Sequence, residues 1–177
     1  NLQNLVVSQL ILCNADNSSI TNITIDGSPA LQNNGLLVDV VKGSNFTGIN
    51  STHNRAGMVF WSSSNNIITS SILKNNIEGG ILLRDSYANI ITNNTLSGNG
   101  RGIDLRSSNS NIITNNTANN NGAGIYLSGS NSNIITNNTA NNDDFGIMLE
   151  GGNSNNSLTS NTANNNNYGI IFASSSN

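Results

Sequence analysis

Residues 109–142 read NSNIITNNTANNNGAGIYLSGSNSNIITNNTANN, and the second half of this stretch repeats the first almost letter for letter. Asparagine is its commonest residue, although asparagine is a poor helix former and is depleted in ordinary strands. A sequence that keeps so many asparagines at fixed places must use them in a way that depends on the repeat. The period of the repeat is therefore the first property to establish.

Two markers set the period at 22 or 23 residues. The tetrapeptide NIIT begins at residues 66, 89, 111 and 133, and NSLT begins at residue 156. The repeat covers residues 35–177 well and residues 1–34 only loosely, so we expect one domain, residues 1–177, with degenerate N-terminal coils. The second marker is a glycine followed by an apolar residue, which recurs at Gly35, Gly57, Gly80, Gly102, Gly124, Gly146 and Gly169.

Apolar residues alternate over short distances and never keep the spacing of three and four that marks a helix. Short strands separated by polar turns, at this period, predict an all-β, single-stranded right-handed parallel β-helix of about eight coils. Leucine-rich repeats have a similar period, but their signature and their helical half are missing. The residues one and three positions after each glycine should share the inward face: Leu36/Val38, Met58/Phe60, Ile81/Leu83, Ile103/Leu105, Ile125/Leu127, Ile147/Leu149 and Ile170/Phe172.

Stacked coils explain the asparagines. Each turn residue lies about 4.8 Å from its counterpart in the next coil, so one side-chain amide can donate to the next carbonyl oxygen and continue a ladder. Asparagine also adopts the left-handed conformation that tight turns need. We predict an inward ladder of Asn94, Asn116, Asn138 and Asn161, with Ser71 one coil earlier. We predict a second, serine column at Ser63, Ser86, Ser108 and Ser130.

The unit NIITNNTxxNNxxGIxLxxS resembles the right-handed β-helix repeats of NosD-like proteins and of carbohydrate-binding proteins and sugar hydrolases. The resemblance implies the fold but not one activity, because surface proteins, epimerases, lyases, hydrolases and copper-processing proteins share this repeat. NosD-like proteins are associated with copper delivery, which implies clustered Met, His or Cys ligands. Here His53, Cys13, Met58 and Met148 fall on different coils, so the sequence predicts no metal site and no cofactor.

Composition and charge exclude several classes of function. The net charge of −3 and the six scattered basic residues give no footprint for nucleic acid. No apolar run approaches the length of a membrane span, and the single cysteine cannot form an intramolecular disulfide. Candidate N-glycosylation sequons, which occur by chance in asparagine-rich repeats but are typical of extracellular or cell-surface proteins, begin at Asn17, Asn22, Asn45, Asn50, Asn93, Asn115, Asn137 and Asn155.

Seven of the fifteen charged residues fall between residues 74 and 106. Glycosidases need paired carboxylates, and β-helical lyases typically need a basic residue near carboxylates that hold calcium. If the protein is an enzyme, its catalytic residues are Glu78, Arg84, Asp85, Asp104 and Arg106. The register favours a plainer interpretation. Glu78 faces Arg101 one coil away, and both aspartates neighbour the two other arginines, which predicts a solvated ion-pair patch. The sequence therefore favours no enzymatic activity.

The acidic pair Asp143 and Asp144, together with Glu150, is a weaker candidate site. Carboxylates at a turn can hold calcium, but calcium needs six to eight oxygen ligands from a spaced set of residues. A replacement of asparagine by aspartate within the repeat is the simpler interpretation of this pair.

Two outward columns are apolar: Leu37, Val59, Leu82, Tyr126, Met148 and Ile171 form the first, and Ile67, Ile90, Ile112 and Ile134 form the second. β-Branched residues on an outer sheet face stabilise the ladder in many solenoids, but a long exposed apolar stripe also marks interaction surfaces. Both interpretations remain open. If the columns form an interface, the partners are copies of the protein or adjoining repeats.

The two ends of the predicted solenoid add to this expectation. The repeat stops at FASSSN without the polar cap that solenoids usually have, so the chain is either part of a longer array or stacks on a copy of itself. We therefore expect an extracellular or cell-surface structural module that self-assembles or forms a rigid adhesive stalk. The alternative is a carbohydrate-binding or polysaccharide-processing domain.

Overall fold

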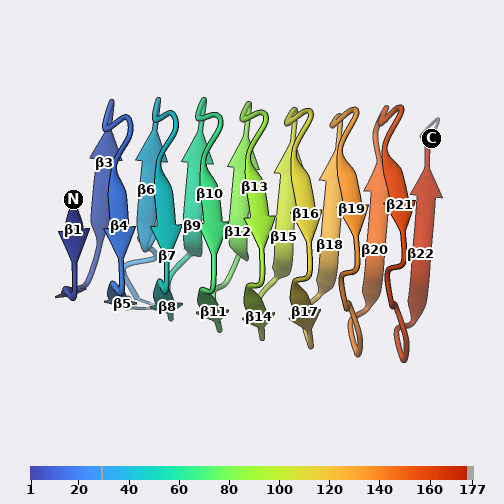
Figure 1. Cartoon of the computed structure of the whole chain (residues 1–177). Coiled ribbons are helices and arrows are strands. Elements are labelled where there is room, and N and C mark those ends of the chain that lie inside the picture. Colours follow the sequence, from blue (N-terminus) through green and yellow to red (C-terminus); the bar gives the residue numbers. More distant parts are fainter. Residues whose placement is uncertain (29, 175–177) are drawn as a thin grey trace.

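The chain winds through three parallel sheets, and each strand pairs with its equivalents in neighbouring coils (Figure 1). The structure is a computed structural model that describes residues 1–28 and 30–174, so the last three residues of FASSSN lie outside the described residues. All elements in the described ranges are strands. Accordingly, these ranges contain no helix with the length and apolarity needed to cross a membrane.

Sheets A and C have eight strands each and sheet B has six. Sheet A consists of β1 (Leu2–Gln3), β4 (Ser19–Thr21), β7 (Asn45–Thr47), β10 (Ile67–Thr69), β13 (Ile90–Thr92), β16 (Ile112–Thr114), β19 (Ile134–Thr136) and β21 (Ser157–Thr159). Sheet B consists of β2 (Val6–Val7), β5 (Thr24–Asp26), β8 (Asn50–Thr52), β11 (Ile72–Lys74), β14 (Thr95–Ser97) and β17 (Thr117–Asn119). Sheet C consists of β3 (Leu10–Cys13), β6 (Leu36–Asp39), β9 (Ala56–Trp61), β12 (Gly79–Arg84), β15 (Arg101–Arg106), β18 (Ala123–Ser128), β20 (Phe145–Glu150) and β22 (Tyr168–Ala173).

The strand register follows the sequence repeat. Ile68 pairs with Ile91, and Ile91 pairs with Ile113, so equivalent residues of successive coils lie side by side. The predicted fold is confirmed: the chain forms a right-handed parallel β-helix of about eight coils.

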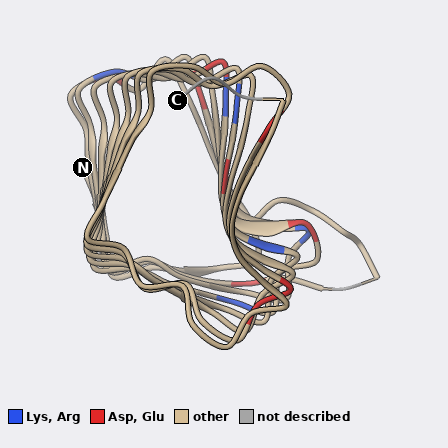
Figure 2. Ribbon diagram, turned by 90° about the vertical axis from the view of Figure 1, so that its right-hand side faces the viewer, with Lys and Arg blue, Asp and Glu red and all other residues tan. Residues whose placement is uncertain are grey.

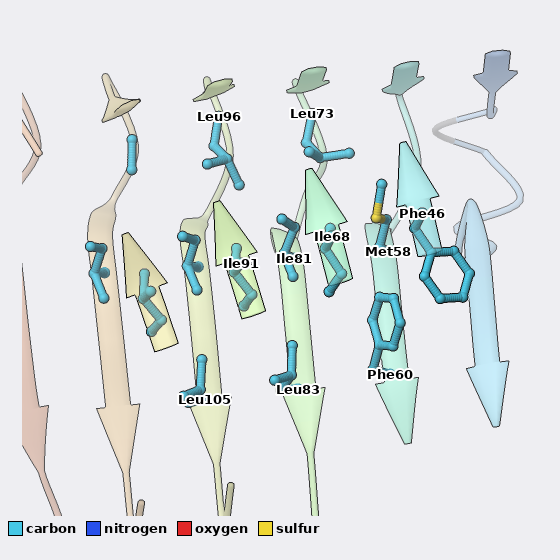
Figure 3. Close-up of a cluster of buried hydrophobic side chains, with 14 of the residues drawn as sticks. Phe46, Met58, Phe60, Ile68, Leu73, Ile81, Leu83, Ile91, Leu96 and Leu105 are labelled. Atoms are coloured by element: carbon cyan, nitrogen blue, oxygen red, sulfur yellow. The ribbon is translucent and has the colours of Figure 1, made fainter. Parts of the chain in front are cut away.

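The core consists of the predicted inward columns. Ile81, Leu83, Ile103 and Leu105 are all fully buried, and the close-up in Figure 3 shows such side chains stacked coil upon coil. Each buried aliphatic side chain stabilises the fold by about 1.5 to 3 kcal/mol. In the last coil the same positions, Ile170 and Phe172, are 47% and 52% exposed, because no described coil follows them.

Asparagine ladders run along the inside of the turns between the sheets. In the predicted ladder, the Asn94 side-chain amide donates to Asn116 Oδ1 at 3.0 Å, and Asn116 donates to Asn138 Oδ1 at 3.0 Å. Each of these amides also donates to a main-chain carbonyl of the preceding coil, as Asn116 does to Ile91 O at 2.9 Å. Asn161 accepts from Asn138 and continues the series. The ladder thus satisfies buried polar groups that the turns would otherwise leave unpaired.

Two further asparagine ladders were not predicted. The asparagine that begins each NIIT tetrapeptide forms one of them, between sheets C and A: Asn66, Asn89, Asn111, Asn133 and Asn156. The other lies between sheets B and C and consists of Asn54, Asn76, Asn99, Asn121, Asp143 and Asn166. The serine column also forms, because each serine hydroxyl accepts from the main-chain N–H one coil earlier, as Ser86 does from Ser63 at 3.0 Å.

The outward column of sheet C differs from the predicted apolar stripe. Val59, Leu82 and Tyr126 are only 5%, 2% and 6% exposed. Alternation places them on the outer face, but Val59 and Leu82 pack in one cluster with Ala56 and Leu37, and the Arg101 guanidinium lies over the Tyr126 ring. Leu37, Met148 and Ile171 are half-buried. This face of the solenoid is therefore recessed and is no flat apolar surface.

The second predicted column, on the outer face of sheet A, is more open. Ile67 and Ile134 are 37% and 44% exposed, and Ile90 and Ile112 are half-buried. Of the two columns expected to face solvent, only this one does so over several coils.

Candidate functional site

Three hollows follow one another along the outer face of sheet C. The first is lined by Leu37, Asp39 and Trp61. The second shares Trp61 and extends to Glu78. The third shares Glu78, extends over four coils to Glu150 and has a volume of about 470 Å³, within the usual size range of ligand sites. We call this elongated depression the sheet C track.

Figure 2 shows that charged residues gather mainly along one side of the solenoid. A local insertion contributes to this side. In most coils, one residue separates the ladder residue between sheets B and C from the following strand of sheet C. In one coil two residues, Ile77 and Glu78, separate the ladder residue Asn76 from Gly79, the first residue of β12. The extra residue lies in the turn between β11 and β12. Here Glu78 lines both the second and the third hollow.

Asp104 is the most enclosed charged group of the track. Its side chain is 0% exposed and forms ion pairs with three guanidinium groups. Arg84 contacts both carboxylate oxygens at 3.2 Å, Arg106 contacts them at 3.3 and 3.2 Å, and Arg101 lies at 3.5 Å. A buried carboxylate requires such partners, because an unpaired charge away from water is very costly.

Glu78 extends this network toward the N-terminal end of the solenoid. Its two carboxylate oxygens pair with Arg55 at 3.1 Å and with Arg84 at 3.2 Å. Arg84 therefore bridges Glu78 and Asp104, and its side chain is only 14% exposed. The result is a row of alternating charges along the axis.

Tyr126 ends the row on the C-terminal side. Its ring lies 4.3 Å from the guanidinium carbon of Arg101, which is cation–π geometry. Its hydroxyl donates a hydrogen bond to Glu150, which lies on the neighbouring strand of the next coil. Burial raises the pKa of the Tyr126 phenol, and the hydrogen bond to Glu150 raises it further. The Tyr126 ring is thus held between two fixed partners at the floor of the third hollow.

The predicted charge cluster forms, but its pairing differs from the prediction. Glu78 pairs with Arg55 and Arg84 and not with the expected Arg101. Asp85 is exposed at a left-handed turn with a φ of 49° and takes no part in the ion pairs found among the described residues. The expectation of a solvated patch is wrong for Asp104, because three side chains fold over it and exclude water.

Asp143 occupies a position that is asparagine in the four preceding coils of its ladder. Its Oδ1 accepts from the Asn121 main-chain N–H at 2.6 Å, whereas its Oδ2 is buried and has no hydrogen-bond partner. Burial raises the pKa of this carboxyl to about 7. Asp144 is exposed and lines the third hollow. The geometry is that of an Asp-for-Asn replacement and does not assemble a calcium site from Asp143, Asp144 and Glu150.

The residues that could bind a soft metal do not come together. Met58 is fully buried in the core, His53 pairs with Asp26 at 3.0 Å on an exposed turn, and Cys13 is exposed at the end of β3. Among the described residues, no three His, Cys, Asp or Glu side chains lie close enough to hold a metal ion. These side chains therefore do not fit the copper role that the repeat's resemblance implies.

All eight sequon asparagines lie on the surface. Asn17, Asn22, Asn45, Asn50, Asn93, Asn115, Asn137 and Asn155 are each at least partly accessible to solvent. Several occupy left-handed turn positions, as Asn93 and Asn115 do with a φ of 56° each. Their modification stays a prediction.

Solved structures with the same architecture include a tailspike protein, an epimerase module and a lyase. The Dettilon tailspike protein matches with a TM-score of 0.74 and 19% identity over 88% of this chain and 37% of its own. The A-module of the Azotobacter vinelandii mannuronan C-5 epimerase AlgE4 matches with a TM-score of 0.72 and 18% identity over 99% of this chain and 57% of its own. An alginate lyase from Paenibacillus sp. matches with a TM-score of 0.59 and 12% identity over 99% of this chain and 92% of its own.

The chain spans 37% and 57% of the length of the tailspike and the epimerase module, and at these identities the likeness establishes the fold alone. No curated protein resembles the chain closely enough in sequence to count as a relative. The profile of one family, described as "Periplasmic copper-binding protein (NosD)", matches residues 14–177. Since this match covers most of the sequence, the chain belongs to the NosD family.

Proposed function

We propose that this chain is a polysaccharide-binding β-helix domain that holds an extended glycan along the sheet C track. The observation that carries the proposal is the shape and lining of the track, in which three hollows joined by Trp61 and Glu78 follow the solenoid axis. Trp61 is 52% exposed, and the Tyr126 and Phe145 side chains line the far end. Aromatic faces with polar groups between them suit the apolar faces and hydroxyl edges of sugars.

The names of the similar structures support this function. They are a tailspike protein, a mannuronan epimerase and an alginate lyase. The proposal stops at binding, because the carboxylates best placed for catalysis are engaged: Asp104 with three arginines and Glu150 with Tyr126. The family description as periplasmic supports a location outside the cytoplasm, in the periplasm or at the cell surface.

Binding to a panel of neutral and acidic polysaccharides, measured by affinity electrophoresis, tests the proposal. Trp61→Ala should weaken binding at least about fivefold, because an aromatic contact contributes about 1 kcal/mol beyond its buried area. Tyr87→Ala is the matched control, since Tyr87 is a 50% exposed aromatic residue outside the track. Failure to bind any glycan, or an equal loss in both variants, would contradict the proposal.

Self-association is the second candidate function. The observation in its favour is the partly exposed isoleucine column on sheet A, in which Ile67 and Ile134 are 37% and 44% exposed. The sheet C column gives it little support, because Val59, Leu82 and Tyr126 are buried within the chain. Light scattering at high concentration distinguishes a monomer from an assembly, and a monodisperse monomer would leave glycan binding as the only candidate.

A further inference from the structure

Six charged groups of the sheet C track are satisfied by one another inside the protein. Glu78 is paired with Arg55 and Arg84, and Asp104 is paired with Arg84, Arg101 and Arg106. The side chain of Asp104 is 0% exposed. Breaking such a buried pair leaves an uncompensated charge, which is strongly unfavourable. A charged ligand that recruited one of these arginines would therefore have to disrupt the network.

Arg101 is the cation that a ligand in the third hollow would meet, because it alone among the described basic residues lines that hollow. Its guanidinium group is already committed on two sides. One nitrogen lies 3.5 Å from Asp104 Oδ2, and the group lies against the Tyr126 ring at 4.3 Å. Both contacts fix the plane of the guanidinium, so it is poorly placed to form the paired hydrogen bonds that a carboxylate or sulfate ligand prefers.

The remaining charges around the third hollow are negative. Of the charged groups in its lining, Glu78 is paired with Arg55 and Arg84, and Arg101 is paired with Asp104. Asp144 and Glu150 take part in no ion pair found among the described residues and together contribute a formal charge of −2. Asp144 accepts one hydrogen bond from the Asn167 amide and is exposed. A hollow of one sign of charge repels ligands of the same sign. Carboxylates also accept hydrogen bonds from hydroxyl groups, which an uncharged sugar provides in number.

Given the glycan-binding function proposed above, we infer that the third hollow of the sheet C track selects uncharged, hydroxyl-rich polysaccharides and excludes polyanionic ones such as polyuronates. Asp144 and Glu150 are the residues that set this preference. Trp61 and Tyr126 contribute contact area that does not depend on the ligand's charge.

A matched pair of probes tests the inference directly: polymannuronate and the mannan obtained by reducing its carboxylates to primary alcohols. The two polymers share linkage and length and differ only in charge. At low ionic strength the wild-type protein should bind the reduced polymer at least tenfold more tightly than the acid. Raising the salt concentration should strengthen binding of the acid and leave binding of the neutral polymer unchanged, because salt screens exposed charges.

The variant Asp144→Asn/Glu150→Gln should reduce the discrimination to within about threefold, since removing two like charges from the lining removes most of the repulsion. The glutamine introduced by Glu150→Gln keeps an oxygen that can accept from the Tyr126 hydroxyl, and the melting temperature reports whether the fold is retained. The control Asp85→Asn removes one carboxylate outside the hollow and should keep the wild-type preference.

The outcomes separate the two levels of the proposal. Equal or tighter binding of the acid polymer, or unchanged discrimination in the folded double variant, overturns the charge preference while glycan binding stands. If the protein binds polyanionic polymers of the panel and no neutral ones, the charge preference also fails. Binding to no polymer of either kind overturns the glycan-binding function itself.

Discussion

Replacing Asp143 with asparagine should stabilise the protein at neutral and alkaline pH. In the same ladder, the amides of Asn99 and Asn166 donate to the carbonyls of Leu73 and Ala140 at 3.0 and 2.8 Å. Asp143 presents the buried, unpartnered Oδ2 at the equivalent position. A neutral carboxyl can donate a hydrogen bond from this atom, whereas an ionised carboxylate cannot. The amide introduced by Asp143→Asn would donate at every pH.

The magnitude follows from the pKa of the Asp143 carboxyl, which burial raises from 3.8 to about 7. A raised folded-state pKa means that the native state binds the proton more tightly than the unfolded chain. The wild type therefore has its full stability below about pH 4, loses stability between about pH 4 and 7, and carries a constant penalty above that range. A pKa difference of about 3 corresponds to an upper limit of about 4 kcal/mol. The variant should lack this loss.

Urea denaturation followed by circular dichroism at pH 4, 6 and 8 measures the effect. The free energies of unfolding of wild type and Asp143→Asn should agree near pH 4 and diverge as the pH rises, with the variant more stable at pH 8. Asp85→Asn is the control, because Asp85 is an exposed carboxylate outside this ladder and its removal should preserve the wild-type profile. A variant that loses as much stability as the wild type between pH 4 and 8 would refute the reasoning.

Three other substitutions probe the ladder, the ion network and the surface. Asn116→Leu removes the acceptor of Asn94 and the donor to Ile91 O and should lower the free energy of unfolding by about 1 to 3 kcal/mol for each group left unpaired; an unchanged melting temperature would mean that the ladder contributes little. Asp104→Asn leaves three arginines without their shared counter-ion and should lower the free energy of unfolding by about 3 kcal/mol. A variant with the denaturation midpoint of the wild type would contradict this expectation. Met148→Asp combined with Ile171→Lys changes two half-buried residues of the sheet C column and should weaken any self-association seen by light scattering while keeping the fold; an assembly unaffected by both charges does not use this column.

The fold could be predicted from the sequence because the repeat encodes it redundantly. Each Gly-x-x-x unit supplies two inward residues, such as Ile81 and Leu83, and both are fully buried. The sequence predicts the ladder that contains Asn116, because in each NNT tripeptide the first asparagine, such as Asn115, is a turn residue and the second points inward. The alternation within NIIT predicts only the faces of its two isoleucines, so the ladder that begins with Asn66 follows from the structure and not from this pattern.

The site could be predicted only in part, because alternation specifies the face of a sheet and not what covers it. Leu82 was correctly assigned to the outer face, yet it is 2% exposed. Its burial depends on residues outside its own strand, because Leu82 packs with Ala56 and Val59 of the neighbouring coil. The same limit applies to Asp104, which the sequence placed near arginines without showing that three of them would enclose it.

The equivalence of the coils has a consequence for how such a protein can change in length. Because each coil pairs only with its two neighbours and offers the same ladder atoms above and below, a duplicated coil could be inserted between two existing ones with every ladder bond re-formed. The sheet C track does not share this freedom, since its contacts join particular residues of adjacent coils. Duplication between β12 and β15 would move Arg84 one coil away from Asp104, whereas duplication after β22 would leave both untouched. Growth and loss of coils should therefore be tolerated outside the segment from Arg55 to Glu150 and selected against within it.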